Sequence, residues 1–328
     1  MPNVFRHPTA RLGALVMAIA AAAISAGVVL AAYPDKPLRL VVPFTPGGGT
    51  DIIARSLGAE IAKELGQPVV IDNKPGAGTV IGTDAVAKSR ADGYTLLVAT
   101  FAHAVNPSLQ PKLPYEWDKA FAPVILVGRG PNVLVVRADS TYQSVGDVIA
   151  AAKANPGKLT YASFGNGTSA HLAGEMLTNL AKVEMTHVPY KGFGPAMTDV
   201  LGGRVDMIFG TAAGVAGFVS NGKVRPIGVT SAQRSPALPG IPAIAETVPR
   251  YRVESWYGIY APAGTLPDVI AKLNATIGKV AKTDEFRKRV EPEGLVISAG
   301  SPAELDDFVR EEEALWRKIV TENNIRPD

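Results

Sequence analysis

The chain has 328 residues, of which 47% are hydrophobic and 19% are charged, and it contains no cysteine. It therefore forms no disulfide and carries no cysteine-linked lipid, and the residues beyond the first 32 supply enough apolar side chains for two lobes. Its 33 basic and 30 acidic side chains show no clustered basic face of the kind that nucleic-acid binding requires. We expect no nucleic-acid partner.

The first 32 residues have the pattern of a secretory signal peptide. Arg6 and Arg11 form a basic start, residues 12–30 are apolar and uncharged, and alanines follow at 31–32. A membrane anchor is the alternative, because the apolar stretch is nearly long enough to span a bilayer. The small residues at its end favour cleavage, and cleavage predicts export to the periplasm. It would lower the basic count from 33 to 31 against 30 acids, a net charge of about +1.

Short runs rich in Val, Ile and Leu predict strands that alternate with helices. In chain order they read LRLVV, VVI, TLLVA, VLVV, LTYAS, THVPY, VDMIF and PIGVT. Between them lie apolar stripes such as Ile53, Leu57 and Ile61, spaced four apart on one helix face. The alternation predicts an α/β protein with mainly parallel sheets flanked by helices. Residues 266–319 read mostly as helix, with one Gly/Pro-containing break.

Two extended segments have the features of domain boundaries. Residues 121–140 join two strand-like runs through a Gly/Pro break, and residues 244–264 precede the C-terminal helices. If both cross between lobes, the first lobe is discontinuous and consists of residues 33–132 and 254–328. The second lobe is then residues 133–253. Two crossing strands with a cleft between the lobes are typical of receptors that close around a ligand.

Each predicted lobe contains a strand, a glycine-rich loop and a helix in succession. The first such stretch is VVPFTPGGGTDIIARSLG, residues 41–58, and the second is LTYASFGNGTSAHLAGEMLTNLA, residues 159–181. Free N–H groups at a helix start carry about half a positive charge in sum, and glycines let a ligand approach the backbone. One loop per lobe predicts an anion site between the lobes. Ordinary strand–helix turns are the alternative interpretation.

Neither loop is a nucleotide-binding motif. PGGGTD lacks the lysine of a Walker loop, and GNGTSA departs from G-x-G-x-x-G at its last position. An anion held without lysine or arginine in either loop is better matched by a carboxylate than by a polyphosphate. We therefore predict a carboxylate ligand.

Five stretches follow one another in a distinctive order. They are YPDKPLRLVVPFTPGGGTDIIAR, VIDNKPGAGTVIGTDAVAKSRADGYTLLVAT, THVPYKG, VLGGRVDMIF and WYGIYAPAGTLPDVIAKLN. Together they resemble the Bug family, which is related to the substrate-binding component of tripartite tricarboxylate transporters. The resemblance implies a periplasmic receptor with the two-lobe, type II binding-protein fold that takes up small organic acids or related solutes. It also implies that main-chain groups of both glycine loops hold the ligand carboxylate, often through ordered waters. Ligand identity does not carry over, because the distal pocket varies within the family.

The two loops supply most of the candidate ligand-binding residues. In the first loop these are Phe44, Thr45, Gly47, Gly48, Thr50 and Asp51, and in the second loop Ser163, Gly165, Gly167 and Thr168. Asp51 has an alternative role, because its carboxylate would repel a bound carboxylate. It would then cap the helix or order the loop. Ser169 is an alternative cap for the second helix.

Further candidates lie at strand ends, one turn into the second helix and near the second crossing. They are Thr100, His103, His171, Tyr190 and Trp256. A structural role is the alternative for His171, and packing at the hinge is the alternative for Trp256. Lys191 would pair with a second acid of the ligand or remain solvated. The turn NKPGAGT, residues 73–79, is assigned mainly to packing.

An exported hydrolase acting on a small carboxylate-containing compound is the alternative function. SFGNG is not a G-x-S-x-G elbow, and four histidines without cysteine provide no zinc-site spacing. A purely structural or adhesive protein would not need two matched anion loops. We therefore expect a monomeric receptor without catalytic residues, metal or cofactor. Its partners would be a small organic acid and the membrane subunits of a tripartite tricarboxylate transporter, with a sensory role as the alternative to transport.

Overall fold

A computed structural model describes residues 33–110, 112–290 and 294–327. The predicted signal peptide, residues 1–32, lies outside the described residues. The predicted apolar runs form strands, because aliphatic and β-branched side chains fill the faces of a buried sheet. The described strands are β1 (Leu38–Val42), β2 (Val69–Asn73), β3 (Thr95–Thr100), β4 (Phe121–Arg137), β5 (Thr160–Ser163), β6 (Thr186–Pro189), β7 (Met207–Thr211), β8 (Val224–Val229), β9 (Glu254–Pro262) and β10 (Val296–Ile297).

The helices follow the predicted amphipathic patterns, and Ile53, Leu57 and Ile61 are buried on one face of α2. They are α2 (Gly49–Leu65), α3 (Val80–Ala87), α4 (Phe101–Leu109), α5 (Val145–Ala154), α6 (Ser169–Ala181), α7 (Phe193–Leu201), α8 (Ala212–Ser220), α9 (Pro267–Ala281), α10 (Asp284–Val290) and α11 (Pro302–Glu322), with short 3₁₀ turns η1 (Ala77–Thr79) and η2 (Ile244–Glu246). In the described part of the chain, no helix combines the length and the apolar character needed to cross a membrane.

The strands form one hydrogen-bonded set in the order β2-β1-β3-β9-β4-β7-β5-β6, with β8 and β10 also paired to β4. The pairs β1–β2, β1–β3, β5–β6 and β5–β7 are parallel. The pairs that include β4 or β9 are antiparallel. Both halves are therefore mixed: the parallel pairs form the two ends of the strand order, β2-β1-β3 and β7-β5-β6, and β8 and β10 are antiparallel to β4.

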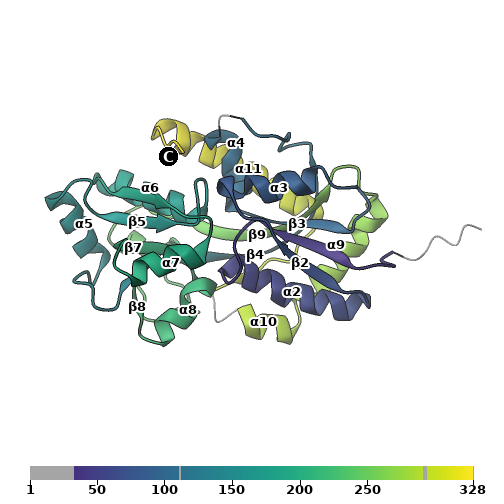
Figure 1. The fold of residues 1–328 in the computed structure, drawn as a ribbon, viewed down its shortest axis with the longest axis horizontal. Coiled ribbons are helices and arrows are strands. Elements are labelled where there is room, and N and C mark those ends of the chain that lie inside the picture. Colours follow the sequence, from purple (N-terminus) through teal and green to yellow (C-terminus); the bar gives the residue numbers. More distant parts are fainter. Residues whose placement is uncertain (1–32, 111, 291–293, 328) are drawn as a thin grey trace, which may run out of the picture. The chain divides into compact units, whose positions relative to one another are not determined.

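Strand β4 belongs to both halves of the sheet. Its residues 121–131 pair with β9, and from Asn132 onward it pairs with β7 and β8. We call the half with β1, β2 and β3 the first lobe and the half with β5, β6, β7 and β8 the second lobe. Figure 1 shows the second lobe at the left, the first at the right, and β4 and β9 between them. The two-lobe α/β prediction is confirmed, whereas the residue boundaries 132/133 and 253/254 stay a prediction.

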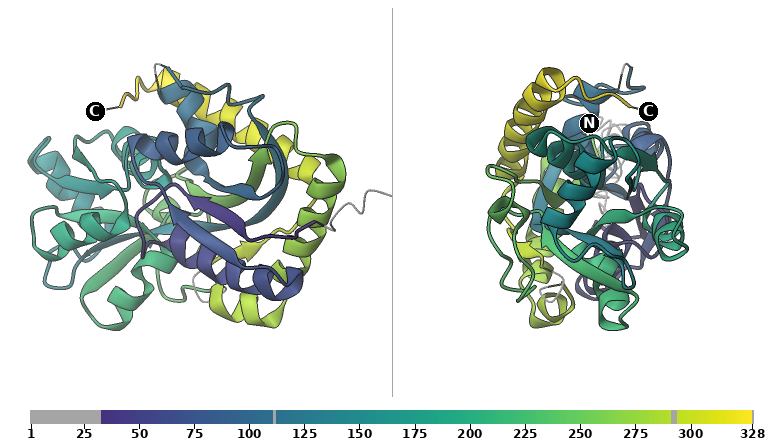
Figure 2. Two further views of the ribbon diagram at one scale, coloured as in Figure 1. Left: turned by 45° about the vertical axis from the view of Figure 1, so that its right-hand side comes forward. Right: turned by 90° about the vertical axis from the view of Figure 1, so that its left-hand side faces the viewer.

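The C-terminal helices complete the first lobe. Helix α11 packs against α4 and β4, and α9 packs against α2 and β4. The left view of Figure 2 shows α11, in yellow, beside the blue segment that contains α4. The chain breaks once more than predicted, between α9 and α10, where Thr283 Oγ1 accepts the Phe286 N–H and so starts a new helix. Residues 36–328 form one compact unit, so that contacts between the lobes lie within it.

Candidate functional site

The first glycine loop connects β1 to α2 and leaves the start of α2 without a capping side chain. Gly48 is the N-cap in an extended conformation, with φ −84° and ψ 168°. Gly47 has φ +86°, a left-handed conformation that favours glycine, and its N–H donates to Asp51 Oδ2 at 2.9 Å. The first N–H groups of α2 therefore have no capping side chain as acceptor.

The Asp51 carboxylate holds this loop in place through hydrogen bonds. Its Oδ2 also accepts from Arg55 Nε at 2.9 Å, and its Oδ1 accepts from Asn73 Nδ2 at 2.9 Å. The Asn73 amide additionally donates to the Phe44 carbonyl at 3.0 Å. Burial alone would raise the pKa of Asp51, but the hydrogen bonds from Arg55, Gly47 and Asn73 outweigh burial and lower it. These contacts favour the loop-ordering role of Asp51 over direct ligand contact.

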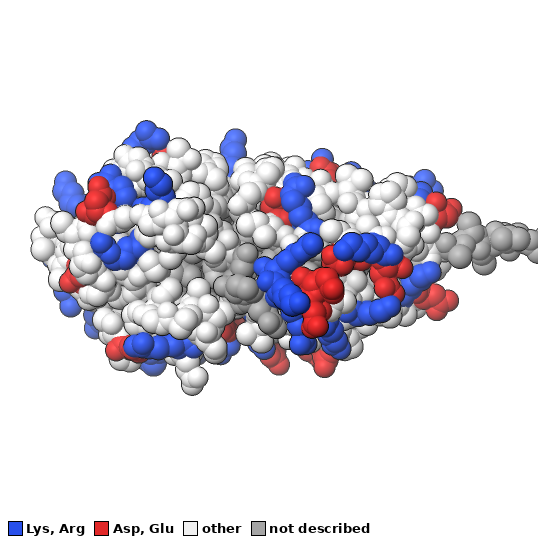
Figure 3. All heavy atoms as spheres, turned by 90° about the horizontal axis from the view of Figure 1, so that it is seen from below, with Lys and Arg blue, Asp and Glu red and all other residues white. Residues whose placement is uncertain are grey.

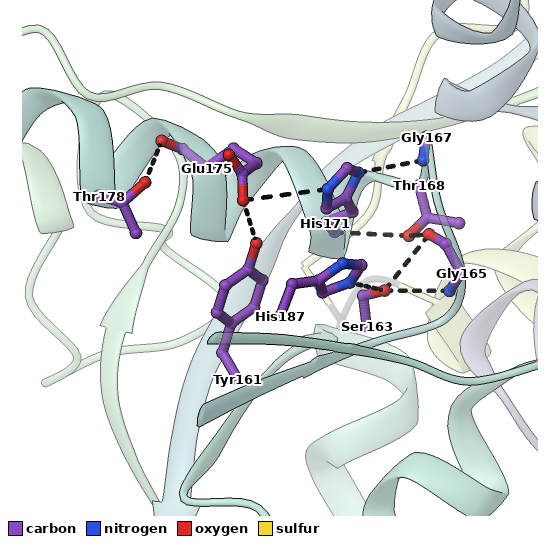
Figure 4. Close-up of polar contacts among 9 residues, drawn as sticks. All are labelled: Tyr161, Ser163, Gly165, Gly167, Thr168, His171, Glu175, Thr178 and His187. Atoms are coloured by element: carbon purple, nitrogen blue, oxygen red, sulfur yellow. Dashed lines mark hydrogen bonds and ion pairs between the residues drawn. The ribbon is translucent and has the colours of Figure 1, made fainter. Parts of the chain in front are cut away.

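The second glycine loop uses its own polar groups internally (Figure 4). The Gly165 N–H donates to Ser163 Oγ at 3.1 Å, and Thr168 Oγ1 donates to the Gly165 carbonyl at 2.7 Å. The Gly167 N–H donates to His171 Nδ1 at 3.2 Å. Gly165 and Gly167 have φ +122° and +79°, so both positions need glycine for the turn itself. Thr168, rather than Ser169, is the N-cap of α6.

Two stacked histidines support this loop (Figure 4). The rings of His171 and His187 are 4.2 Å apart, and His187 also stacks on Tyr161 at 5.0 Å. His187 Nε2 lies 2.7 Å from Ser163 Oγ. Burial lowers the pKa of His187 to about 4. His171 must accept at Nδ1, so its other nitrogen carries the proton and points toward Glu175, 4.0 Å away. The structure thus gives His171 a supporting role in the loop.

The lobes approach each other where glycines leave room for them. A Cβ at Gly49 would overlap Thr211 Oγ1 and lie 3.0 Å from Ala213 Cβ, both in the second lobe. A Cβ at Gly192 would overlap Thr45 Oγ1 in the first lobe. The predicted residue Thr45 therefore lies at the contact between the lobes, and its buried hydroxyl oxygen has no hydrogen-bond partner among the described residues.

A small cavity lies at this contact. It is lined by Phe44, Gly48, Gly49, Thr50, Phe164, Phe193 and Thr211, and its volume of about 10 Å³ is near that of one water molecule. Three helices start at its wall, because Gly48, Gly192 and Thr211 are the N-caps of α2, α7 and α8. None of the seven lining residues is charged. The partial positive charge of the three helix ends would favour an anionic oxygen here.

A larger pocket of about 430 Å³ lies beside Phe164, which also lines the small cavity. It is lined by Pro43, Gly76, Ala77, Gly78, Thr79, Gln110, Phe164, Gly165, Asn166, Pro189, Tyr190, Lys191 and Pro327. Its volume suits a small organic ligand. Tyr190 donates its hydroxyl proton to Asp199 Oδ2 at 2.6 Å, and burial followed by this bond raises its pKa to about 12. The pocket combines residues of both lobes.

Several predicted residues line these two pockets, and others only support them. Phe44, Gly48 and Thr50 line the small cavity, and Gly165 and Tyr190 line the larger pocket. The supporting residues, which line neither pocket, are Gly47, Asp51, Ser163, Gly167, Thr168 and His171. The ligand-binding roles stay predictions.

Three predicted residues lie apart from both pockets. His103 is buried between Phe121 and Tyr260, with ring centroids 5.1 and 4.9 Å away, and burial lowers its pKa to about 4. Trp256 is 1% exposed and borders a separate cavity of about 60 Å³ near α11. Thr100 is a buried N-cap of α4. The structure does not bring these three together with the glycine loops, because the end of β3, helix α4 and strand β9 place them in the buried interior.

The sequence interpretation missed other lining residues. The turn at 73–79, assigned to packing, supplies four residues of the larger pocket, and Gln110 and Asn166 were not considered. Thr211 was also missed, although VDMIFGTAAG has the signal of a strand followed by a Thr-capped helix. Within the described ranges there is no cluster of three His, Cys, Asp or Glu side chains that could hold a metal ion.

The two lobes, the crossing strands and the pockets between the lobes define the class of two-lobe solute-binding receptors. The profile of the tripartite tricarboxylate transporter family receptor matches residues 53–325. The chain is 41% identical over 295 residues to a Pseudomonas sp. (strain P51) protein from the tcbD-tcbE intergenic region, covering 89% of this chain and 88% of that protein. It is 36% identical over 321 residues to Protein BugT of Bordetella pertussis, covering 97% and 98%. The chain belongs to this receptor family.

Solved structures agree with this assignment. An R. palustris protein with adipate is 36% identical, with a TM-score of 0.87 over 90% of this chain and 100% of that chain. MatC from Rhodopseudomonas palustris with bound malate is 33% identical, with a TM-score of 0.83 over 88% and 100%. The predicted family, fold and role as a carboxylate-binding receptor are confirmed. A further structural neighbour, the periplasmic binding protein BugD, is 33% identical, with a TM-score of 0.87 over 90% of this chain and 100% of that chain.

Proposed function

We propose that this receptor captures a small organic acid between its lobes, with one carboxylate at the junction of α2, α7 and α8. The convergence of three helix N-termini on an uncharged cavity carries the proposal. The remainder of the ligand would occupy the pocket of about 430 Å³. Adipate and malate, the ligands of two structural neighbours, are both dicarboxylates. Lys191 lines the larger pocket and would attract a second carboxylate.

The receptor would release the acid unchanged. Ser163 and His187 have the close contact of a nucleophile and a base, but Ser163 is 0% exposed and its oxygen also bonds Gly165. A substrate would not reach this oxygen without opening the loop. Incubation with the bound acid, its amide and its ester, followed by mass spectrometry, should show no conversion of any of them.

Export, monomeric state and transporter partnership complete the proposal. Cleavage after residue 32 would release the receptor into the periplasm, where membrane subunits of a tripartite tricarboxylate transporter would receive the acid. On the face seen in Figure 3, basic side chains lie among acidic ones rather than in one basic patch, which supports the absence of a nucleic-acid partner. N-terminal sequencing and light scattering of the exported protein test cleavage and the monomeric state.

A thermal-shift screen of mono-, di- and tricarboxylates tests the ligand class. At a hundred times its dissociation constant, a bound acid should stabilise the fold by about 2.7 kcal/mol. The matching amides should give no shift, and equal shifts from acid and amide would contradict the carboxylate assignment. Lys191→Ala should cost about tenfold in affinity for a dicarboxylate and less for a monocarboxylate. An equal loss for both would place Lys191 away from the second acid.

A further inference from the structure

Asn132 is a buried side chain whose hydrogen bonds are missing. It is 0% exposed, and neither its Nδ2 nor its Oδ1 has a hydrogen-bond partner among the described residues. Native proteins rarely leave a buried amide without hydrogen bonds. The amide loses its hydrogen bonds to water on burial, and this loss costs free energy unless other partners replace the water. A buried carboxamide with both ends unsatisfied therefore indicates a partner that is not part of the chain.

The backbone of Asn132 is held firmly where the lobes meet. Its N–H donates to Thr230 Oγ1 at 2.8 Å, and its carbonyl accepts from the Thr230 N–H at 2.9 Å. The Thr230 carbonyl in turn accepts from the Val253 N–H at 2.9 Å, on the segment that leads into β9. Thr230 thus ties both crossing segments together. The Asn132 backbone is consequently fixed where the two crossing segments meet.

The sheet register gives the direction of this carboxamide. Asn132 is opposite Thr211 in the antiparallel β4–β7 pair, so the two side chains lie on the same face of the sheet. Thr211 lines the small cavity, and its Oγ1 is the atom that a Cβ at Gly49 would overlap. The face shared by Asn132 and Thr211 is therefore the one turned toward the start of α2.

We propose that Asn132 is a ligand-contact residue at the hinge, and this inference rests on the proposed function. Its Nδ2–H would donate to a carboxylate oxygen at the small cavity and join the three helix ends as a fourth, uncharged donor. Its Oδ1 would accept from an ordered water or a hydroxyl of the same ligand. Ligand binding would thereby give a partner to both ends of this buried amide.

The first test replaces Asn132 by leucine, which has a similar shape and no polar atoms. Asn132→Leu should raise the melting temperature of the free protein by about 2–4 °C, because it removes two unsatisfied atoms. It should weaken binding of the acid that gives the largest shift in the carboxylate screen by at least about tenfold. A purely structural asparagine would show the reverse, with lower stability and unchanged affinity.

Asn274→Leu is the matched control. The Asn274 amide donates to the carbonyls of Val124 and Gly300 at 2.8 and 2.9 Å in the first lobe. Its substitution should lower the melting temperature, because two carbonyls lose their donor, and it should leave affinity unchanged. If Asn132→Leu raises the melting temperature and weakens binding while Asn274→Leu only lowers the melting temperature, Asn132 contacts the ligand and Asn274 has a structural role.

The second test replaces Asn132 by aspartate and reads the pH profile. Asn132→Asp places a carboxylate beside that of the ligand, so affinity at pH 7.5 should fall by about a hundredfold or more. It should recover as the pH falls and the introduced carboxyl becomes a protonated donor, whereas the parent should not improve. Parent-like affinity and pH profile in both variants would overturn the role of Asn132. A parent that binds no carboxylate would instead overturn the proposed function, and this inference with it.

Discussion

The two glycine loops have the same strand–loop–helix pattern but use their backbones differently. In the first loop the start of α2 has no capping side chain, and Gly48 and Thr50 line the small cavity. In the second loop, Ser163 and His171 take the N–H groups of Gly165 and Gly167. The first loop therefore has backbone N–H donors that are available to a ligand. In the second loop, the N–H groups of Gly165 and Gly167 are already bonded to side chains of the same loop and helix. A glycine-rich loop can serve as an anion site or as a compact turn, and the hydrogen bonds decide which.

The side chains that hold the two loops also differ in charge. Asp51 holds the first loop as a carboxylate with a lowered pKa. His187 supports the second loop as a neutral ring, because burial lowers its pKa to about 4. Acidification should therefore affect the second loop before it affects the first.

The largest expected effect on ligand affinity comes from adding a methyl group at the contact between the first loop and the start of α8. In Gly49→Ala the added methyl would overlap Thr211 Oγ1, so that the lobes could not reach their present contact. Ligand affinity should fall by about a hundredfold or more, measured by calorimetry, because a displaced first loop cannot offer its donors at the small cavity. Stability of the free protein should hold or rise, since alanine favours a helix by up to about 1 kcal/mol.

Gly217→Ala is the control for this change. Gly217 lies on α8, and a Cβ there would meet nothing within 4 Å. Binding should remain near that of the parent, and stability should rise by up to about 1 kcal/mol, because Gly217 is an exposed position inside the helix. If Gly49→Ala bound the acid as tightly as Gly217→Ala does, the contact between the first loop and α8 would not belong to the bound state.

Acidification tests the histidine support of the second loop. The pKa of His187 and of His103 is about 4 in the folded chain against 6.5 ordinarily, so the unfolded chain takes up protons first as pH falls. The free energy of unfolding should be constant above pH 6.5 and fall between pH 6.5 and 4. Each histidine would contribute a loss of about 3 kcal/mol at most. Urea unfolding at a series of pH values measures this slope.

Two variants show how much each histidine contributes to the dependence of the unfolding free energy on pH, with His187 in the second lobe and His103 in the first. His187→Gln should remove its share of the slope and also reduce the acid sensitivity of ligand binding. His103→Phe should remove a share of the slope and leave the pH dependence of binding unchanged, because His103 lies between Phe121 and Tyr260 in the core. An unaltered slope in His187→Gln would show that His187 is already protonated or exposed in the folded protein.

The smallest expected effect concerns Asp51. In Asp51→Asn the new amide cannot accept from Gly47, Arg55 and Asn73 at once, so stability at pH 7 should fall by about 2 kcal/mol. The pKa of Asp51 lies below its ordinary value of 3.8, so its contribution persists above that pH and is lost as pH falls through the lowered value. Parent and variant should therefore converge only below pH 3.8. Convergence already at pH 5 would contradict an ionised, hydrogen-bonded Asp51.

Local features of the chain were predictable from the sequence. The strands formed where Val, Ile and Leu cluster, and α2 buried the stripe of Ile53, Leu57 and Ile61, because burial of an apolar face depends on spacing along one element. The crossing of two strands followed from extended segments at β4 and β9. The residues of the larger pocket at 76–79 were not recognised, because a glycine turn looks the same whether it faces the core or a cleft.

The sequence by itself determined the succession of strands and helices, the two glycine loops and the family, since these depend on neighbouring residues and on their order. The tertiary structure decided how each loop uses its N–H groups, because Asn73 and His187 lie more than twenty residues from the loop atoms that they contact. It also placed His103 in the core and brought Asn132 opposite Thr211. Such partners are set by sheet register and lobe packing, which no local pattern encodes.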